Sequence, residues 1–276
     1  MLNYKILNLD KNAEWVTFIH GFGGDMSFWN PQIDEFIKVF NVLLIDLRGH
    51  GQSKIQSNTT YSLKLAVDDV LKVLDFLNIS KTHLIGSSFG TIIVKAFAND
   101  YPERTLKIIL TGAIFKLDKY QNFLLSMGRI LHPLVGYNGI LKVFTRILMA
   151  GKNQKKERTF VIKIGKNLGR DEFKKWSIIA KTLRPDLFKI WSSKSEIPTL
   201  IVMGSEDKLF LPQAKKAVAN LTDITLKIIN KCGHVVNLAK PKDFNKLALD
   251  FLTSQYHSEG VKRNSNGVIE ASNVSL

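Results

Sequence analysis

Short apolar runs alternate with helical patterns over the first 112 residues of the chain. The Tyr61–Asn78 segment repeats apolar residues every three or four positions, and Thr91–Asn99 is a second apolar segment of helical length. Five other runs are rich in Val, Ile and Leu, as strands buried on both faces are. They predict strands at Tyr4–Leu9, Trp15–His20, Val42–Asp46, His83–Ile85 and Leu106–Thr111. The alternation predicts a parallel sheet with helices on both faces.

The rhythm changes between residues 113 and 195. Here apolar residues recur at helical spacing throughout, for example at Leu141, Phe144 and Leu148, and no strand pattern interrupts them. This pattern predicts an all-helical insertion over residues 113–195.

The strand pattern resumes at Pro198. It predicts strands at Thr199–Met203 and Thr225–Ile229, and helices near Gln213–Leu221 and Lys242–Tyr256. Residues 257–276 are rich in Ser, Asn and Gly without any period, which predicts a disordered tail. The chain is therefore predicted to be one α/β core, residues 1–112 and 196–256, interrupted by the helical insertion.

The composition allows a packed interior without covalent or metal cross-links. Of 276 residues, 45% are hydrophobic and 23% are charged, which excludes a disordered chain. The single cysteine, Cys232, excludes an intramolecular disulfide and fits a reducing compartment, and no Cys or His pair has zinc-ligand spacing, so no metal is expected. The first residues lack a signal-peptide pattern and no run of about 18 apolar residues occurs, which predicts a cytoplasmic protein.

Most of the positive charge lies in the insertion. The whole chain has 39 Lys and Arg against 24 Asp and Glu, a formal net charge of +15. Residues 113–195 contain 18 Lys and Arg but only 5 Asp and Glu, whereas the rest of the chain contains 21 and 19. The location of the charge makes an acidic partner of the insertion one hypothesis to weigh.

The segment Gly86-Ser87-Ser88-Phe89-Gly90 lies between a predicted strand and a predicted helix. In a G-x-S-x-G pattern the strand turns abruptly into the helix, and the two glycines leave room for the central serine to stand exposed above the sheet. The frame selects Ser88, because centring the pattern on Ser87 would require glycine at Ile85 and Phe89. Ser88 is the candidate nucleophile. The alternative is a glycine-containing turn with a purely structural role.

A serine nucleophile needs a histidine to take its proton and a carboxylate to orient that histidine. Asp207 and His234 each follow a predicted strand, so both are expected at the carboxyl edge of the sheet, where active sites of open α/β sheets lie. Glu206 is an alternative acid that only geometry distinguishes from Asp207. The other histidines are rival bases: His20, His50, His83, His132 and His257.

Acyl transfer also needs hydrogen-bond donors for the oxyanion of the tetrahedral intermediate. His20-Gly21-Phe22-Gly23-Gly24 follows a predicted strand, and its glycines allow a tight loop that presents the backbone N–H of Phe22. The second predicted donor is the N–H of Phe89. A nucleotide-binding glycine turn is the alternative, but Met26 stands where a third glycine would be needed and no Walker lysine follows.

Taken in order, these segments resemble the signatures of the α/β-hydrolase superfamily. The resemblance rests on His20–Gly24, Asp46–Ser53, Gly86–Gly90, Gly204–Asp207 and Cys232–His234. It runs from about residue 15 to residue 256, and the helical insertion takes the place of that family's lid. It implies the α/β-hydrolase fold, which is a mostly parallel central sheet flanked by helices. No cofactor is expected for the reaction. Only one strand clearly precedes Trp15–His20, where the family often has two.

Within the superfamily the chain is similar to small esterases, acyl thioesterases, C–C bond hydrolases and cofactor-free haloperoxidases. Ser88 argues against haloalkane dehalogenases and epoxide hydrolases, which use aspartate at that position. The Asp46–Ser53 segment resembles a family loop of structural role. Four aromatic residues near the oxyanion elements are candidates for an apolar acyl pocket: Phe22, Phe28, Trp29 and Phe89. For Phe28 and Trp29, packing in the core is the alternative.

The predicted function is hydrolysis of a carboxylic ester or thioester through an acyl-enzyme. Ser88 attacks the acyl carbon, His234 acts as base and then as acid, and Asp207 orients the imidazole. The amides of Phe22 and Phe89 hold the oxyanion. Two alternatives stay open: a lipase that works at a lipid interface, and a non-catalytic binding or signalling protein that keeps the fold as a ligand pocket.

Three explanations compete for the basic insertion. The first is a solvated, lysine-rich surface, the second is binding to an anionic membrane surface, and the third is docking of an acidic acyl carrier. If the protein is an interfacial lipase, its activity is expected to rise on anionic vesicles, and charge reversal at Lys155, Lys156 and Arg158 is expected to remove that rise. Nucleic acid is not expected, because no reader motif occurs and the aromatic residues follow a packing period.

Overall fold

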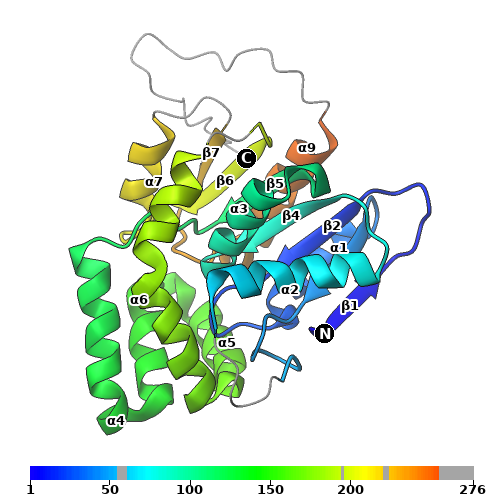
Figure 1. Cartoon of the computed structure of the whole chain (residues 1–276). Coiled ribbons are helices and arrows are strands. Elements are labelled where there is room, and N and C mark those ends of the chain that lie inside the picture. Colours follow the sequence, from blue (N-terminus) through cyan, green and yellow to red (C-terminus); the bar gives the residue numbers. More distant parts are fainter. Residues whose placement is uncertain (55–60, 194–195, 220–223, 255–276) are drawn as a thin grey trace.

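A seven-stranded sheet runs through the centre of the computed structural model, which describes residues 1–54, 61–193, 196–219 and 224–254 (Figure 1). The spatial order of the strands is β1-β3-β2-β4-β5-β6-β7. Their bounds are β1 Tyr4–Leu7, β2 Trp15–Ile19, β3 Asn41–Ile45, β4 Thr82–Ser87, β5 Thr105–Thr111, β6 Thr199–Gly204 and β7 Ile224–Ile229. β1 pairs antiparallel with β3, and the other neighbouring strands pair in parallel. The predicted mostly parallel α/β sheet is confirmed, with one strand ahead of β2.

Helices cover both faces of this sheet. Those outside the insertion are η1 Met26–Trp29, α1 Asn30–Phe36, α2 Leu63–Phe76, α3 Phe89–Asp100, η2 Pro102–Arg104, α7 Leu211–Val218, α8 Val236–Ala239 and α9 Pro241–Thr253. Side chains of β3 alternate between the two layers: Leu43 and Ile45 pack with α2 and α3, whereas Val42 and Leu44 pack with α1 and α9. Because both layers are apolar, the buried strands are continuously apolar in sequence.

The segment between β5 and β6 is helical and lies beside one end of the sheet (Figure 1). It contains α4 Lys119–Leu148, η3 Lys152–Gln154, α5 Lys155–Gly165, η4 Lys166–Leu168 and α6 Arg170–Ser192. Gly136 has φ 66° and ψ 172°, so α4 consists of two helical halves that meet at a kink. None of the helices in the described ranges is long and apolar enough to cross a bilayer. The predicted tail, residues 257–276, lies outside the described residues.

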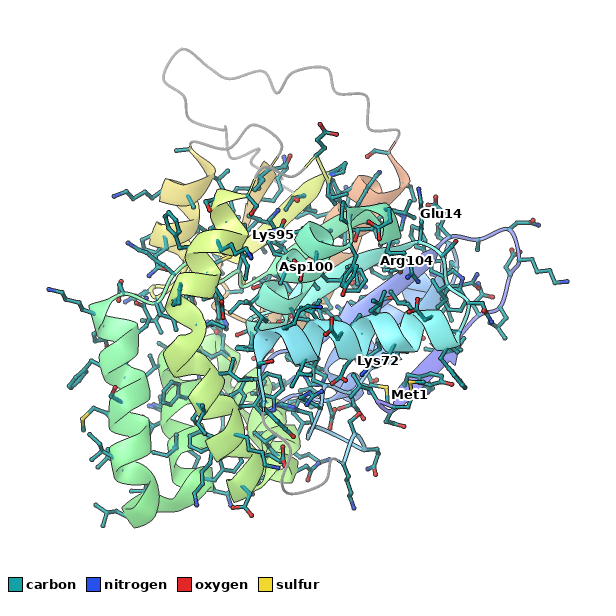
Figure 2. The ribbon with its side chains drawn as sticks, viewed as in Figure 1. Met1, Glu14, Lys72, Lys95, Asp100 and Arg104 are labelled. Carbon is teal, nitrogen blue, oxygen red and sulfur yellow. The ribbon has the colours of Figure 1, made fainter. Side chains whose placement is uncertain are left out.

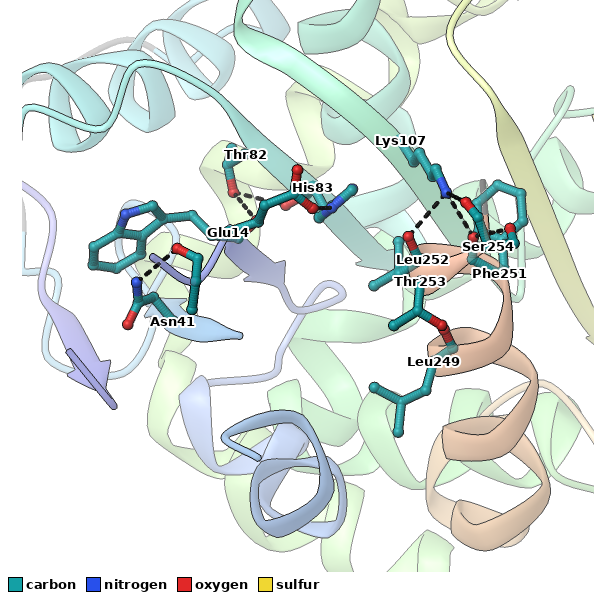
Figure 3. A network of polar contacts seen from close by, with 12 residues as sticks. Glu14, Asn41, Thr82, His83, Lys107, Leu249, Phe251, Leu252, Thr253 and Ser254 are labelled. Atoms are coloured by element: carbon teal, nitrogen blue, oxygen red, sulfur yellow. Dashed lines mark hydrogen bonds and ion pairs between the residues drawn. The ribbon is translucent and has the colours of Figure 1, made fainter. Parts of the chain in front are cut away.

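Polar contacts hold the amino end of the sheet, and one rival histidine belongs to them (Figure 3). His83 Nε2 lies 3.0 Å from a carboxylate oxygen of Glu14. Nearby, Lys107 Nζ donates to three carbonyl oxygens at the end of α9, those of Phe251, Leu252 and Ser254, at 2.7–2.9 Å. His83 stands near the start of β4 and Ser88 follows its end, about 17 Å along an extended strand, which places this histidine out of reach of the serine.

Lys95 is a buried cation on α3, on the side of this helix that meets α6 (Figure 2). The residue is 3% exposed, and no ion pair of its amine occurs among the described residues. One turn further along α3, Asn99 Nδ2 donates to the carbonyl oxygen of Ile190 in α6 at 2.8 Å. Burial lowers the pKa of Lys95 to about 8.

Replacement of this cation by an apolar residue is expected to stabilise the fold. Lys95→Met should raise the free energy of unfolding at pH 7 by about 2 kcal/mol, because it removes a buried charge and keeps an apolar stem. The unfolded chain holds the lysine proton up to about pH 10.5, whereas the folded chain releases it near pH 8. The free energy of unfolding of the unsubstituted protein therefore rises with pH between these values, and the advantage of the variant shrinks. Urea unfolding at pH 7 and pH 10 measures this difference, and a difference independent of pH would contradict the assignment.

Candidate active site

Ser88 lies in a strained turn between β4 and α3. Its backbone has φ 51° and ψ −118°, a conformation that residues with a Cβ rarely adopt. Its N–H donates to the carbonyl oxygen of Thr111 in β5 at 2.9 Å. Its carbonyl oxygen accepts from the N–H and the hydroxyl of Thr91 at 2.9 and 2.6 Å. The turn is thus held on both sides.

The glycines on either side of Ser88 are required by close backbone packing. A Cβ at Gly86 would lie 2.6 Å from the carbonyl oxygen of Gly90. A Cβ at Gly90 would lie 2.4 Å from the carbonyl oxygen of Ile19 in β2. Any larger residue at either position would push the turn off the sheet.

Ser88, His234 and Asp207 form one chain of hydrogen bonds. His234 Nε2 lies 2.8 Å from Ser88 Oγ, and His234 Nδ1 lies 2.7 Å from Asp207 Oδ2. Asp207 and His234 are each 2% exposed, and the other carboxylate oxygen of Asp207 accepts from the N–H of Phe210 at 3.0 Å. A carboxylate that holds Nδ1–H leaves Nε2 free to accept the proton of the serine hydroxyl. The structure brings together the three side chains that the motifs select.

Glu206, the alternative acid, points toward the insertion. Its carboxylate accepts from Gln154 Nε2 at 2.8 Å. The same carboxylate lies beside Gly151, where a Cβ would stand 2.7 Å from it. Of the two adjacent acids, only Asp207 contacts His234.

His20, a rival base, has both ring nitrogens bound to the backbone. Nδ1 donates to the carbonyl oxygen of Gly21 at 2.8 Å, and Nε2 accepts from the N–H of Leu47 at 3.0 Å. Burial lowers the pKa of this imidazole, so the ring is neutral.

His50 is used in the same way on the other side of the glycine loop. Its Nε2 accepts from the N–H of Gly23 at 3.0 Å, and its Nδ1 donates to the carbonyl oxygen of Arg48 at 3.1 Å. Burial lowers the pKa of His50 well below its ordinary value, and the neighbouring His20 lowers it further. The two histidines hold the loop at residues 20–24 against residues 46–53, a role that the motifs did not show. Of the remaining rivals, His132 lies in α4 and His257 lies outside the described residues.

The glycine loop runs directly beside the nucleophile. A Cβ at Gly21 would lie 3.0 Å from Ser88 Cβ, and the loop is tightened by a 3.0 Å hydrogen bond from the N–H of Gly24 to the carbonyl oxygen of Gly21. Among the hydrogen bonds of the described residues, the N–H groups of Phe22 and Phe89 have no acceptor. Phe89 is the first residue of α3, where such N–H groups point out of the helix. Both predicted donors therefore stand next to Ser88 with their hydrogen-bonding capacity unused.

Gly112 contributes to the site and was not singled out by any motif. It has φ +59°, and a Cβ there would lie 3.0 Å from His234 Cε1 and 2.8 Å from the His234 carbonyl oxygen. Only glycine combines that backbone conformation with such close approach to the imidazole. The available signal was its position directly after β5, at the carboxyl edge of the sheet.

Ser88 and His234 line a cavity of about 250 Å³ between the core and the insertion. Its walls are mostly apolar and include Ile92, Leu124, Leu141, Phe144 and Phe173. No Lys, Arg, Asp or Glu is among the described residues that line it. Of the four aromatic residues predicted near the oxyanion elements, Phe22, Phe28 and Phe89 line the cavity. Trp29 is fully buried against Phe18 and Phe28 and belongs to the core.

Trp176 of α6 joins the insertion to the site. Its Nε1–H donates to the carbonyl oxygen of Arg48 at 3.1 Å. Its ring stands edge-on to Phe89 and to His50, with ring centroids 5.1 and 5.2 Å apart. From α4, the carbonyl oxygen of Leu148 accepts from the N–H of His234 at 3.3 Å. The insertion is therefore packed onto the residues around Ser88.

Residues 14–129 match the family model described as alpha/beta hydrolase fold, and this stretch includes both the glycine loop and the Ser88 turn. The chain has the α/β-hydrolase fold. The order Ser88, Asp207, His234 along the chain and the topology of the whole sheet agree with this match. In the described part of the chain, no group of three or more His, Cys, Asp or Glu side chains is arranged to hold a metal ion.

Similar proteins cover nearly the whole chain. A 2-hydroxy-6-oxononadienedioate/2-hydroxy-6-oxononatrienedioate hydrolase of Comamonas testosteroni is 27% identical over 277 residues, 91% of this chain and 92% of the relative. A Bacillus subtilis protein provisionally named a 2-succinyl-6-hydroxy-2,4-cyclohexadiene-1-carboxylate synthase is 26% identical over 270 residues, 92% of this chain and 96% of the relative. A carboxylesterase structure from Nitrososphaera gargenis superposes with a TM-score of 0.78 at 21% identity and covers 91% of this chain and 93% of its own.

Proposed function

We propose that the protein is a serine hydrolase of carboxylic esters or thioesters whose acyl group is uncharged and apolar. The observation that carries this proposal is the hydrogen-bond chain from Asp207 through His234 to Ser88 at the wall of an apolar cavity. Such a chain activates a hydroxyl, which otherwise is a poor nucleophile.

Acylation follows from the positions of these groups. Ser88 Oγ attacks the carbonyl carbon while its proton passes to His234 Nε2, and the Asp207 carboxylate stabilises the imidazolium that forms. The N–H groups of Phe22 and Phe89 donate to the carbonyl oxygen as it becomes an oxyanion. The tetrahedral intermediate then collapses, the bond to the leaving group breaks, and that alcohol or thiol takes the proton from Nε2.

Deacylation repeats the sequence with water. His234 Nε2 removes a proton from a water molecule, whose oxygen attacks the acyl carbon of the Ser88 ester. The second tetrahedral intermediate releases the carboxylic acid, and the proton on Nε2 returns to Ser88 Oγ. The free hydroxyl is restored, so one molecule of enzyme turns over many esters.

Turnover separates this proposal from a binding protein that keeps the same fold. Purified protein is expected to release many equivalents of p-nitrophenol from p-nitrophenyl octanoate. A single equivalent with retained octanoate would overturn the hydrolase and favour the ligand-binding alternative.

The lining of the cavity selects the acyl group. A carboxylate at the far end of the chain would have no cationic partner among the described lining residues, and an unpaired buried charge is costly. The Comamonas testosteroni relative is named for a dicarboxylate, so that substrate does not suit this cavity. A cavity of about 150 Å³ holds benzene, and by that scale 250 Å³ holds an acyl chain of roughly ten carbon atoms.

A charged acyl terminus is expected to be rejected. The p-nitrophenyl monoester of suberic acid should show a kcat/KM about 100-fold or more below that of p-nitrophenyl octanoate, which has the same chain length. Steady-state kinetics on this matched pair checks the expectation. Equal kcat/KM values would show that the acyl chain does not enter the apolar cavity.

A further inference from the structure

The outward face of the first half of α4 is apolar. Six large apolar residues between positions 120 and 135 are exposed: Tyr120, Phe123, Ile130, Leu131, Leu134 and Val135. Their spacing places them on one side of the helix, ahead of the kink at Gly136, and they are called here the α4 stripe. Figure 1 shows this half of α4 at the outer edge of the insertion, away from the sheet. An apolar patch of this extent on a surface indicates an interaction site.

The insertion as a whole carries exposed cations, and few of them have acidic partners among the described residues. Exposed Lys and Arg residues of the insertion include Lys116, Lys119, Lys142, Arg146, Lys155, Lys156, Lys163, Lys166, Lys174 and Lys189. Within the described part of the insertion, one ion pair occurs, between Lys175 and Glu172. Lys116 and Lys119 directly precede the α4 stripe, so cationic and apolar groups lie side by side at the start of α4.

We propose that the insertion docks on an anionic lipid bilayer, with the α4 stripe in the interface and the lysines against the headgroups. Basic amphipathic helices bind such surfaces through buried apolar area together with attraction to anionic lipids. An acidic carrier protein would match the lysines but leave the stripe exposed. A second copy of this chain would bring two strongly basic segments together across a symmetric contact. Of these three partners, only the anionic bilayer matches both the apolar stripe and the lysines.

Docking has a consequence for the cavity, and this consequence rests on the proposed function. Gln121, Leu124 and Gly128 line the cavity from the same half of α4, and by helical spacing Leu124 and Gly128 lie beside the stripe. The acyl cavity therefore adjoins the docking surface along this half of α4. Esters dissolved in the bilayer would reach the cavity along α4. Binding of the protein to the bilayer does not itself depend on catalysis.

Vesicle sedimentation of the full chain tests the docking. The protein is expected to sediment with vesicles of equal parts phosphatidylglycerol and phosphatidylcholine, and to bind pure phosphatidylcholine vesicles about tenfold more weakly or less. Ser88→Ala should bind as the unsubstituted chain does, so a failure of ester hydrolysis leaves this test intact. Equal binding to both kinds of vesicle, or none to either, would overturn the proposal.

A matched pair of double variants tests the α4 stripe. Phe123→Glu with Leu134→Glu replaces residues that are 58% and 81% exposed, and is expected to weaken binding to the anionic vesicles about tenfold or more. The control, Phe76→Glu with Leu9→Glu, replaces two exposed residues outside the insertion, 60% and 76% exposed, and adds the same charge. Vesicle binding of this control should change by less than about threefold. Equal loss in both variants would show that net charge alone drives binding and would overturn the proposal. Thermal unfolding confirms that each variant is folded.

A second matched pair tests the lysines. Lys155→Glu with Lys156→Glu should weaken binding about tenfold or more, whereas Lys242→Glu with Lys246→Glu on α9 should have little effect. Arg158 is left out, because its guanidinium donates to the carbonyl oxygens of Met149 and Gly151. Binding to polyglutamate without binding to anionic vesicles would favour the acidic carrier and overturn the proposal. Self-association removed by the Phe123 and Leu134 changes, without vesicle binding, would favour a second copy and also overturn it.

Discussion

Ser88→Ala is expected to lower kcat for p-nitrophenyl octanoate hydrolysis by about 10⁶-fold. The variant removes the only oxygen that His234 Nε2 contacts at the cavity wall among the described residues, and loss of a triad serine has an effect of this size. The fold should persist, because Ser88 is held by its backbone hydrogen bonds and not by its hydroxyl. Steady-state kinetics measures the loss, and a fluorophosphonate probe should no longer label the protein.

Ser87 provides the control for this variant. It is the neighbouring serine, its hydroxyl is buried without a hydrogen-bond partner, and it does not contact His234. Ser87→Ala should therefore keep its labelling by the fluorophosphonate. Labelling that survives in Ser88→Ala and vanishes in Ser87→Ala would transfer the nucleophile to the other serine and refute the assignment.

Asp207→Asn is expected to lower kcat by about 10⁴-fold with little change in the fold. Asparagine is nearly the same shape as aspartate, but its amide presents a donor to His234 Nδ1 and stabilises the wrong tautomer of the imidazole. His234 Nε2 would then carry the ring proton and could not accept the proton of the Ser88 hydroxyl. Pre-steady-state release of p-nitrophenol should show that the acylation step has slowed.

Glu206→Gln is the matched variant, because it makes the same chemical change one residue away. The Glu206 carboxylate contacts Gln154 and not His234, so kcat should stay within about threefold of the unsubstituted value. A loss at Glu206 as large as that at Asp207 would show that the imidazole is oriented by the other carboxylate. The two variants together decide which acid belongs to the triad.

The elements of the fold could be read from local patterns, because each pattern depends on residues close in sequence. Strands covered on both faces must be continuously apolar, and a strand that turns into a helix at Ser88 needs Gly86 and Gly90. Element ends were less well defined. The first strand was predicted to reach Leu9 but ends at Leu7, and Asn8 has φ 61°, which an extended strand does not allow. The helix after Ser88 begins at Phe89, two residues before the apolar pattern.

Periodicity and short motifs were enough to predict the α/β class, the helical insertion and the residue types of the candidate site. The choice of Asp207 over Glu206 depended on the tertiary structure, since adjacent side chains differ in direction and not in chemistry. The same holds for Trp176, whose indole meets a carbonyl 128 residues earlier in the chain. His20 and His50, which hold the glycine loop, and Gly112, which leaves room for His234, also act through contacts between distant segments. No local pattern encodes a distance between segments so far apart, so only folding could reveal these roles.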